Sequence, residues 1–169
     1  YNDQEKKTTN LTMSGNIRYR LAKGLTANVQ TSLYRRRYDA DSFEKANHYS
    51  KLRTTSVIAN NLERNKVEAF LSYRNTFNKT HSISAVGGYS YQDELSARTT
   101  VTGYGGSTDQ ISTLNGATTV DMTQTTGVRE KLRLIGFYGR AIYDYKKKYL
   151  LTATVRADGS SMFSKDNQW

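Results

Sequence analysis

Residues 11–34 read LTMSGNIRYRLAKGLTANVQTSLY, and this stretch decides the fold class. Apolar or small residues alternate with polar ones up to Leu21, and the alternation resumes at Leu25 after the short run Ala22-Lys23-Gly24. Side chains that alternate with a period of two lie on opposite faces of a β-strand, whereas a helix would show a period near 3.6. We therefore predict two antiparallel strands joined by a tight turn.

Two further stretches repeat this pattern. The second alternates on both sides of Asn78-Lys79-Thr80, with Phe70 as a break, and the third alternates around Lys146-Lys147-Lys148. One predicted face is apolar with tyrosines near the strand ends, and the other carries Arg, Lys, Asn, Gln, Ser and Thr. The sequence thus predicts about six strands in three hairpins, at about 11–34, 66–93 and 131–158.

Long polar segments connect the predicted hairpins, at about residues 35–63 and 95–129 and from 159 onward. Compact soluble domains seldom carry structureless loops longer than about 12–15 residues. Outer-membrane barrels combine short periplasmic turns with long extracellular loops, and their strands exceed the roughly 5–6 residues usual in soluble sheets. We therefore predict an all-β fold, namely a segment of an antiparallel transmembrane β-barrel.

The composition narrows the function classes. Apolar residues make up 36% of the 169 residues, below the usual share of about 45–50%, yet 13 tyrosines argue against disorder. Proline is absent, as suits a chain of paired strands, and the absence of cysteine excludes disulfides and thiolate metal sites. The net charge of +10 is dispersed and accompanies no groove-reading motif, so we expect no nucleic-acid partner.

No group of residues predicts catalysis or a metal site. The only histidines, His48 and His81, fall in a loop and at a turn and are interpreted as solvated. Asp39-Ala-Asp41 with Glu44 lacks the glycine of a calcium loop. The run Gly103-Tyr104-Gly105-Gly106 has no following Lys-Ser/Thr and is interpreted as a flexible loop tip. We expect no enzyme activity and no cofactor.

Three features of the predicted loops remain open between two interpretations. Arg35-Arg36-Arg37 is either a solvated charge run or a site for lipopolysaccharide phosphates. Tyr38 and Tyr104 lie in the candidate selectivity loops, about 36–63 and 95–129, where a tyrosine can stack on a sugar. Nothing in these loops distinguishes a sugar from a peptide substrate.

The C-terminal stretch resembles a motif of a known protein family. Residues 149–163 read YLLTATVRADGSSMF and continue to Asn167-Gln168-Trp169. This stretch resembles the motif of the SusC/RagA-type TonB-dependent transporters of Bacteroidetes outer membranes, and so do the strands before it. The match covers roughly residues 66–94 and 130–169, and it departs at Ala157 and Met162, where basic residues are commoner.

The resemblance implies a 22-stranded barrel with an N-terminal plug in the Gram-negative cell outer membrane. Such a transporter would import oligosaccharides or peptides with a SusD-like surface lipoprotein, driven by the TonB complex and surrounded by outer-membrane lipid and lipopolysaccharide. This chain would supply barrel wall and loops only, without the plug domain and without the segment that contacts TonB. A passive outer-membrane porin and a soluble all-β binding or surface domain remain the alternatives.

The motif residues are interpreted as structural elements of the lumenal wall. Arg156 and Asp158 lie two residues apart and so share one face of a strand. Gly159 and the serines after it would let the chain leave the strand. The predicted set is Arg156, Asp158, Gly159, Ser160, Ser161, Phe163 and Trp169.

Overall fold

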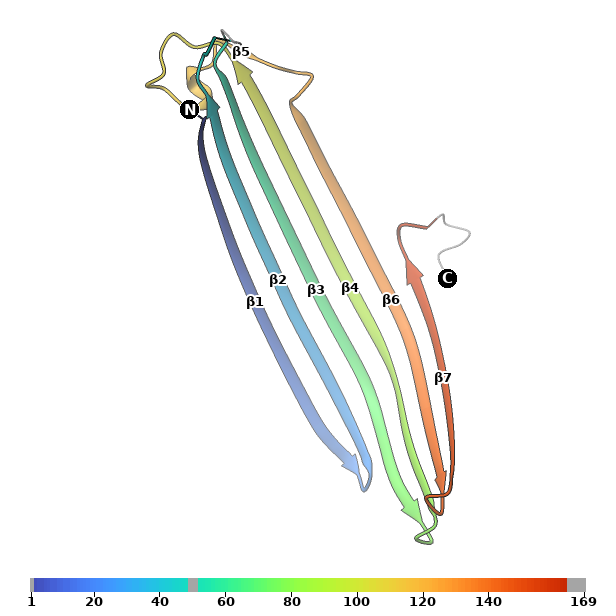
Figure 1. Cartoon of the computed structure of the whole chain (residues 1–169). Coiled ribbons are helices and arrows are strands. Elements are labelled where there is room, and N and C mark those ends of the chain that lie inside the picture. Colours follow the sequence, from blue (N-terminus) through green and yellow to red (C-terminus); the bar gives the residue numbers. More distant parts are fainter. Residues whose placement is uncertain (1, 49–51, 164–169) are drawn as a thin grey trace. The chain divides into compact units, whose positions relative to one another are not determined.

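The protein folds into one antiparallel sheet of long strands. The computed structural model describes residues 2–48 and 52–163. Its long strands are β1 (Asn2–Ala22), β2 (Leu25–Glu44), β3 (Thr54–Phe77), β4 (His81–Tyr104), β6 (Thr126–Tyr145) and β7 (Tyr149–Ser160). They lie in the order β1-β2-β3-β4-β6-β7, and the two-residue strand β5 (Thr119–Val120) pairs with β4 (Figure 1). The predicted fold class, six main strands in three hairpins, is confirmed.

The strands are longer than the alternation indicated. The segments predicted as loops at 35–63 and 95–129 shrink to 45–53 and 105–125, because β2, β3, β4 and β6 all extend into them. Ladder hydrogen bonds join backbones, so pairing continues where the side chains no longer alternate. The predicted strand ranges were therefore too short at the long-loop ends.

The only helical element among the described residues is the short 3₁₀ turn η1 (Leu114–Gly116). No helix in that part of the chain is long and apolar enough to cross a membrane.

The chain divides into two compact units, each treated separately below. The turn-end unit comprises Thr12–Leu33, Arg64–Glu94 and the chain from Leu132 onward, and it contains all three hairpin turns. The loop-end unit comprises the start of β1, Tyr34–Glu63 and Leu95–Lys131, and it contains the two long connections.

Left-handed backbone geometry closes the hairpin turns of the turn-end unit. Gly24 has a φ of 78°, and a Cβ at this position would lie 2.2 Å from the carbonyl oxygen of Arg74. The other two turns place non-glycine residues at positive φ: 49° and 58° at Asn78 and Lys79, and 54° and 55° at Lys146 and Lys147. Two consecutive residues of this kind form the type I′ turn, whose twist matches that of paired strands.

The apolar face of the turn-end unit is exposed. The register of β6 and β7 places Phe137 opposite Ala157, and Tyr143 opposite Leu151, on one face. Ile17 and Val155 are each 71% exposed on that face. No large side chain among the described residues is fully buried. This sheet therefore has no core of its own, and its apolar face depends on its surroundings for cover.

The buried hydrophobic side chains among the described residues, Ala40 and Phe43, belong to the loop-end unit. Phe43 is 4% exposed. β5 folds back on β4, with Gly103 opposite Val120, and a Cβ on Gly103 would lie 2.7 Å from the Cβ of Ala117. Gly105 and Gly106 adopt φ of 82° and 121° and pack closely against the returning chain. The interpretation of this glycine run as a flexible loop tip was wrong, because these glycines form a packed turn.

Candidate functional site: the polar face of the sheet

A hydrogen bond between two strands that are not sequence neighbours organises the polar face of the turn-end unit. The hydroxyl of Tyr138 on β6 donates to Oε1 of Glu68 on β3 over 2.7 Å. Nζ of Lys66 lies 3.3 Å from the other carboxylate oxygen of Glu68. Since β4 runs between β3 and β6, the tyrosine side chain reaches across a whole strand.

Gly88 on β4 makes this reach sterically feasible. A Cβ at Gly88 would lie 2.6 Å from the Cβ of Phe70 and 2.8 Å from the Cζ and hydroxyl of Tyr138. The tyrosine ring therefore occupies the space that a side chain at position 88 would need. Phe70, the break in the predicted alternation, lies on the polar face beside this glycine. An apolar residue occurs there because it packs against Gly88.

A second glycine makes room for the motif residues. Nε of Arg156 donates to Oδ2 of Asp158 over 2.7 Å. Gly136 pairs with Asp158 across β6 and β7, and a Cβ there would lie 2.6 Å from Oδ1 of Asp158 and 2.8 Å from Oγ of Ser90. The glycine on β6 thus makes room for polar side chains from β4 and β7.

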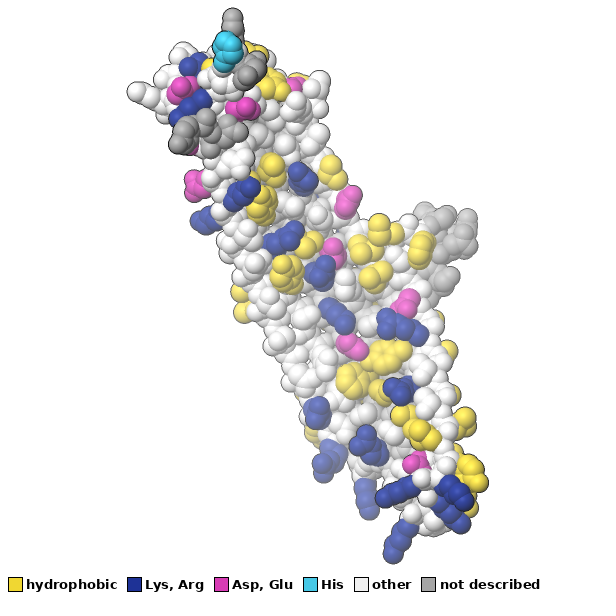
Figure 2. Space-filling view, viewed as in Figure 1, with side chains coloured by type: hydrophobic (Ala, Val, Ile, Leu, Met, Phe, Trp, Pro, Cys, Tyr) yellow, Lys and Arg dark blue, Asp and Glu magenta, His cyan; other side chains and the backbone are white. Residues whose placement is uncertain are grey.

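Several charged groups of this face have charged or polar partners. Arg64 donates to Glu94 over 2.6 Å, and Arg18 donates to the amide oxygen of the buried Asn28 over 3.0 Å. In Figure 2, Lys and Arg side chains spread along the viewed surface with Asp and Glu side chains among them. Such a surface suits contact with water and polar solutes, because the charged groups keep their contact with solvent there.

Other predicted motif residues lie where the chain leaves β7. Gly159 is buried opposite Ile135. Ser161 exchanges two bonds with Arg133: its Oγ accepts from the Arg133 backbone N–H over 2.8 Å, and its own N–H donates to the Arg133 carbonyl over 3.0 Å. The Ser160 carbonyl accepts from the N–H of Phe163, which is 61% exposed, and Trp169 lies outside the described residues.

The arginine run does not form a single cluster. Arg35 forms a salt bridge with Glu63, and Arg37 forms one with Asp39 over 2.8 Å. Arg36 lies between them in β2 and so points to the opposite face. The two arginines that share a face already have carboxylate partners.

The remaining sequence candidates play local structural roles. Nδ1 of His81 lies 2.6 Å from the hydroxyl of Tyr143. A hydrogen bond with Asp121 raises the pKa of Tyr104 at the end of β4. Within the described ranges no three His, Cys, Asp or Glu side chains gather as a metal site would require.

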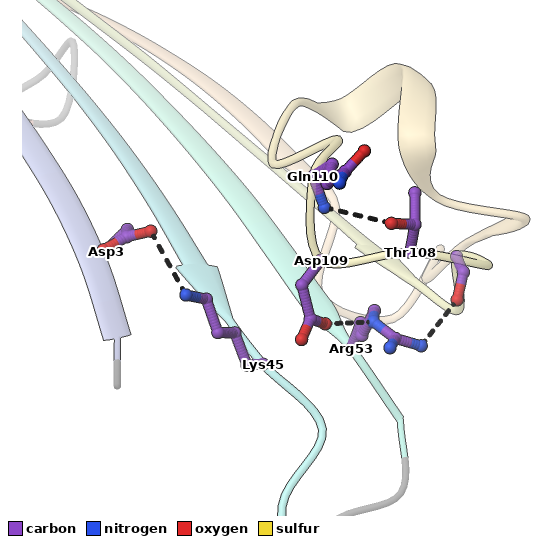
Figure 3. A network of polar contacts seen from close by, with 7 residues as sticks. Asp3, Lys45, Arg53, Thr108, Asp109 and Gln110 are labelled. Atoms are coloured by element: carbon purple, nitrogen blue, oxygen red, sulfur yellow. Dashed lines mark hydrogen bonds and ion pairs between the residues drawn. The ribbon is translucent and has the colours of Figure 1, made fainter.

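Sequence reasoning missed Arg53, which holds the 105–125 connection. Its side chain donates to the Gly106 carbonyl over 2.9 Å and to the Asp109 carboxylate, while its own carbonyl accepts from the N–H of Gly105. Figure 3 shows the contacts of the Arg53 side chain and the Asp3–Lys45 ion pair of the same unit. No sequence pattern pointed to Arg53, since its partners lie more than 50 residues away.

Known proteins share this fold and parts of this sequence. No protein-family model matches the chain. The TonB-dependent receptor P39 of Formosa agariphila is 33% identical over 102 residues, or 60% of this chain and 10% of the receptor. The TonB-dependent receptor SusC of Bacteroides thetaiotaomicron is 42% identical over 48 residues, 28% of this chain and 5% of the receptor.

Among solved structures, that of the RagAB peptide transporter matches 99% of this chain and 19% of its own, with a TM-score of 0.90 at 17% identity. This likeness shows the fold. The chain spans about a tenth of the length of the curated relatives that it matches. The resemblance noted from the C-terminal motif is thereby confirmed.

Proposed function

We propose that this chain, a barrel-wall segment of the SusC/RagA type of TonB-dependent transporter, lines part of a channel that imports oligosaccharides or peptides across the Gram-negative outer membrane. One observation carries the proposal. The sheet of the turn-end unit has one face of mostly exposed apolar side chains, with the Arg133–Asp93 ion pair near the end of β7, and one face of polar and charged side chains.

The two faces require different surroundings. Leu151 and Val155 are 67% and 71% exposed in the described part of the chain. An arginine on the lipid face costs about 2–4 kcal/mol near the midplane and an acidic side chain costs less, so Arg156 and Glu68 belong to the other side. We therefore assign the apolar face to lipid and the polar face to the channel lumen. The motif residues Arg156, Asp158, Gly159, Ser160, Ser161, Phe163 and Trp169 are then structural parts of the lumenal wall.

Transport rather than catalysis is the activity that such a wall supports. The energy would come from the TonB complex, through a plug domain. A SusD-like surface lipoprotein would present the substrate at the loop-end unit. The names of the relatives, which are TonB-dependent receptors, support the dependence on TonB.

Neighbouring residues on opposite faces give a matched test of the orientation. In the full-length transporter, with any other cysteines replaced, we would introduce Thr154→Cys or Val155→Cys. Water-soluble maleimide should label the first variant in intact membranes, and a lipid-phase quencher should reach only a fluorophore on the second. Reversed accessibility would contradict the assignment of faces.

Uptake separates an active importer from a passive porin. Cells that carry the full-length protein should accumulate labelled oligosaccharide or peptide only when TonB is functional, and the protein should co-purify with a surface lipoprotein. Uptake that persists without TonB would favour a porin. A native protein that is monodisperse without detergent would favour a soluble domain, because bare strand edges and an uncovered apolar face cause aggregation.

A further inference from the structure

The hairpin turns and the apolar face of the turn-end unit together form a second candidate site. We propose that this site binds one anionic glycerophospholipid of the periplasmic leaflet, with its phosphate at the lysine turns and an acyl chain in an apolar groove. The inference rests on the proposed function: in an outer-membrane barrel the short turns are periplasmic, so the hairpin turns would lie at that end.

The groove lies on the apolar face and has a volume of about 520 Å³. Five of the residues that line it are small: Ala85, Gly87, Gly139, Ala141 and Ala153. The larger side chains of Leu71, Tyr73 and Val155 also line it. Small residues beside large ones leave a channel of the kind that suits a hydrocarbon chain.

The fold itself does not require glycine in this groove. A Cβ at Gly87 would meet no atom closer than 3.8 Å, and one at Gly139 none closer than 3.5 Å. Both distances are ordinary van der Waals contacts, in contrast to the 2.6 Å at Gly88 and Gly136 on the polar face. Glycine weakens a strand and often marks a bulge, a bend or a site where a ligand or another backbone approaches closely. Among the described residues, no atom lies closer than 3.5 Å to the Cβ position at Gly87 or Gly139, so we assign the space beside them to a bound ligand.

An aromatic cluster lies at the turn end of the same face. The ring centroids of His81 and Tyr145 are 4.9 Å apart, and those of Tyr145 and Tyr149 are 6.4 Å apart. The hydroxyl of Tyr143 contacts His81. Aromatic side chains with polar tips collect at the headgroup level of a bilayer, so this cluster marks the depth of the glycerol region.

The spacing between the aromatic cluster and the groove fits one lipid. In each of three strands, a residue of the aromatic cluster lies four positions from a small residue of the groove: His81 from Ala85, Tyr145 from Ala141, and Tyr149 from Ala153. At roughly 3.3 Å per residue the groove begins about 13 Å from the aromatic cluster. A lipid whose glycerol lies at the cluster would direct its acyl chain toward the groove.

Lysines supply charge complementarity at the turns. Two hairpin turns lie side by side, because the N–H of Lys146 donates to the Thr80 carbonyl over 2.7 Å. Together they carry Lys79, Lys146, Lys147 and Lys148, and Lys and Arg side chains gather at this end in Figure 2. The one carboxylate of the turn, on Asp144, accepts the backbone N–H of Lys147 over 2.8 Å. In the described part of the chain, no salt bridge engages the four lysines, unlike Lys66, which pairs with Glu68.

The turn conformation is unfavourable for lysine. Lys146 and Lys147 both adopt positive φ, which costs an L-residue with a Cβ and which type I′ turns usually satisfy with Asn-Gly. A strained backbone conformation held by an unsuitable residue type points to a role for its side chain. Nζ of Lys146 lies 5.3 Å from the ring centroid of Tyr145, which places this ammonium group beside the aromatic cluster. A phosphate is an anion that lysine ammonium groups bind as point charges.

The double variant Lys146→Asn/Lys147→Gly removes two charges and also suits the turn, so the barrel should still fold. We would reconstitute the full-length transporter in phosphatidylethanolamine nanodiscs with or without phosphatidylglycerol and quantify the retained lipid by native mass spectrometry. The wild-type protein should retain phosphatidylglycerol preferentially. The preference should fall roughly thirtyfold in the variant, since each lysine near an anionic headgroup contributes about a factor of five.

Two further variants test specificity. Lys23→Gln/Arg74→Gln removes two cations near the first turn and should leave the preference unchanged. Gly139→Leu/Ala141→Leu fills the groove with apolar side chains and should displace the lipid although the lysines remain. Equal phosphatidylglycerol retention by the wild type and Lys146→Asn/Lys147→Gly, or by the wild type and the groove variant, would overturn the inference. A protein that needs no lipid or detergent would instead overturn the proposed function.

Discussion

Gly88 should tolerate no side chain, although the adjacent Gly87 should accept one. An alanine Cβ at position 88 would lie 2.6 Å from the Cβ of Phe70, which cannot rotate away because it is bound to the backbone. It would also lie 2.8 Å from the end of the Tyr138 ring, which would have to swing aside and lose its bond to Glu68. At Gly87 the nearest atom would be 3.8 Å away.

The magnitudes follow from these contacts. Overpacking typically costs about 1–3 kcal/mol, and a hydrogen bond to a charged group contributes about 1.5–3 kcal/mol, less where water reaches it. Gly88→Ala should therefore lower the free energy of unfolding by about 2 kcal/mol. Gly87→Ala should raise it by about 0.4–1 kcal/mol, because alanine restricts the unfolded chain.

The assay is the urea-dependent folding equilibrium of the full-length protein in lipid vesicles, followed by the heat-modifiable mobility of the barrel on gels. Tyr138→Phe completes a double-mutant cycle with Gly88→Ala. If the clash displaces the ring, removal of the hydroxyl should cost little in the Gly88→Ala background and more in the wild type. Equal stabilities of the Gly88→Ala and Gly87→Ala variants would refute the packing argument.

Three further predictions concern the turns and the long connection. Lys146→Asn/Lys147→Gly should stabilise the barrel by about 1–2 kcal/mol in the same assay, because Asn and Gly suit positive φ; a loss of stability would contradict the turn assignment. Arg53→Ala should expose the 105–125 connection to proteolysis at neutral pH with the strands intact, whereas unchanged cleavage would mean that other contacts hold it. Hydrogen bonds from Thr123 lower the pKa of Asp121 below its usual 3.8. The ionised carboxylate therefore stabilises the folded connection fully above pH 3.8, and this contribution is lost as the pH falls through the folded pKa. Pepsin cleavage of the connection should therefore rise at strongly acid pH, and Asp121→Asn should remove that pH dependence.

The local alternation of apolar and polar residues predicted the hairpins and the two faces of the strands. The alternation around Ala22-Lys23-Gly24 and Lys146-Lys147-Lys148 located the hairpins, because side-chain period and turn chemistry are properties of neighbouring residues. The placement of Arg156 and Asp158 on one face was also correct, and the two side chains are hydrogen-bonded. The role of the motif in a lumenal wall stays a prediction.

Contacts between segments that lie far apart in the sequence could not be predicted from it. The packed turn at Gly103-Tyr104-Gly105-Gly106 was mistaken for a flexible tip, because the chain that packs on it lies further along the sequence. The clamp formed by Arg53 was not foreseen for the same reason. The type of a residue indicates its own conformational preference. It does not indicate which atoms from distant parts of the sequence will pack beside it.

The sequence by itself determined that this protein is a two-faced antiparallel sheet and which residues lie on each face, because a strand turns its side chains by half a revolution per residue. The tertiary structure alone decided how far the strands extend and why Gly88 and Phe70 interrupt the polar face. It also decided that Tyr138 crosses β4 to reach Glu68, residues that are 70 positions apart. Strand pairing determines such neighbours, and pairing depends on backbone groups that are alike at nearly every position.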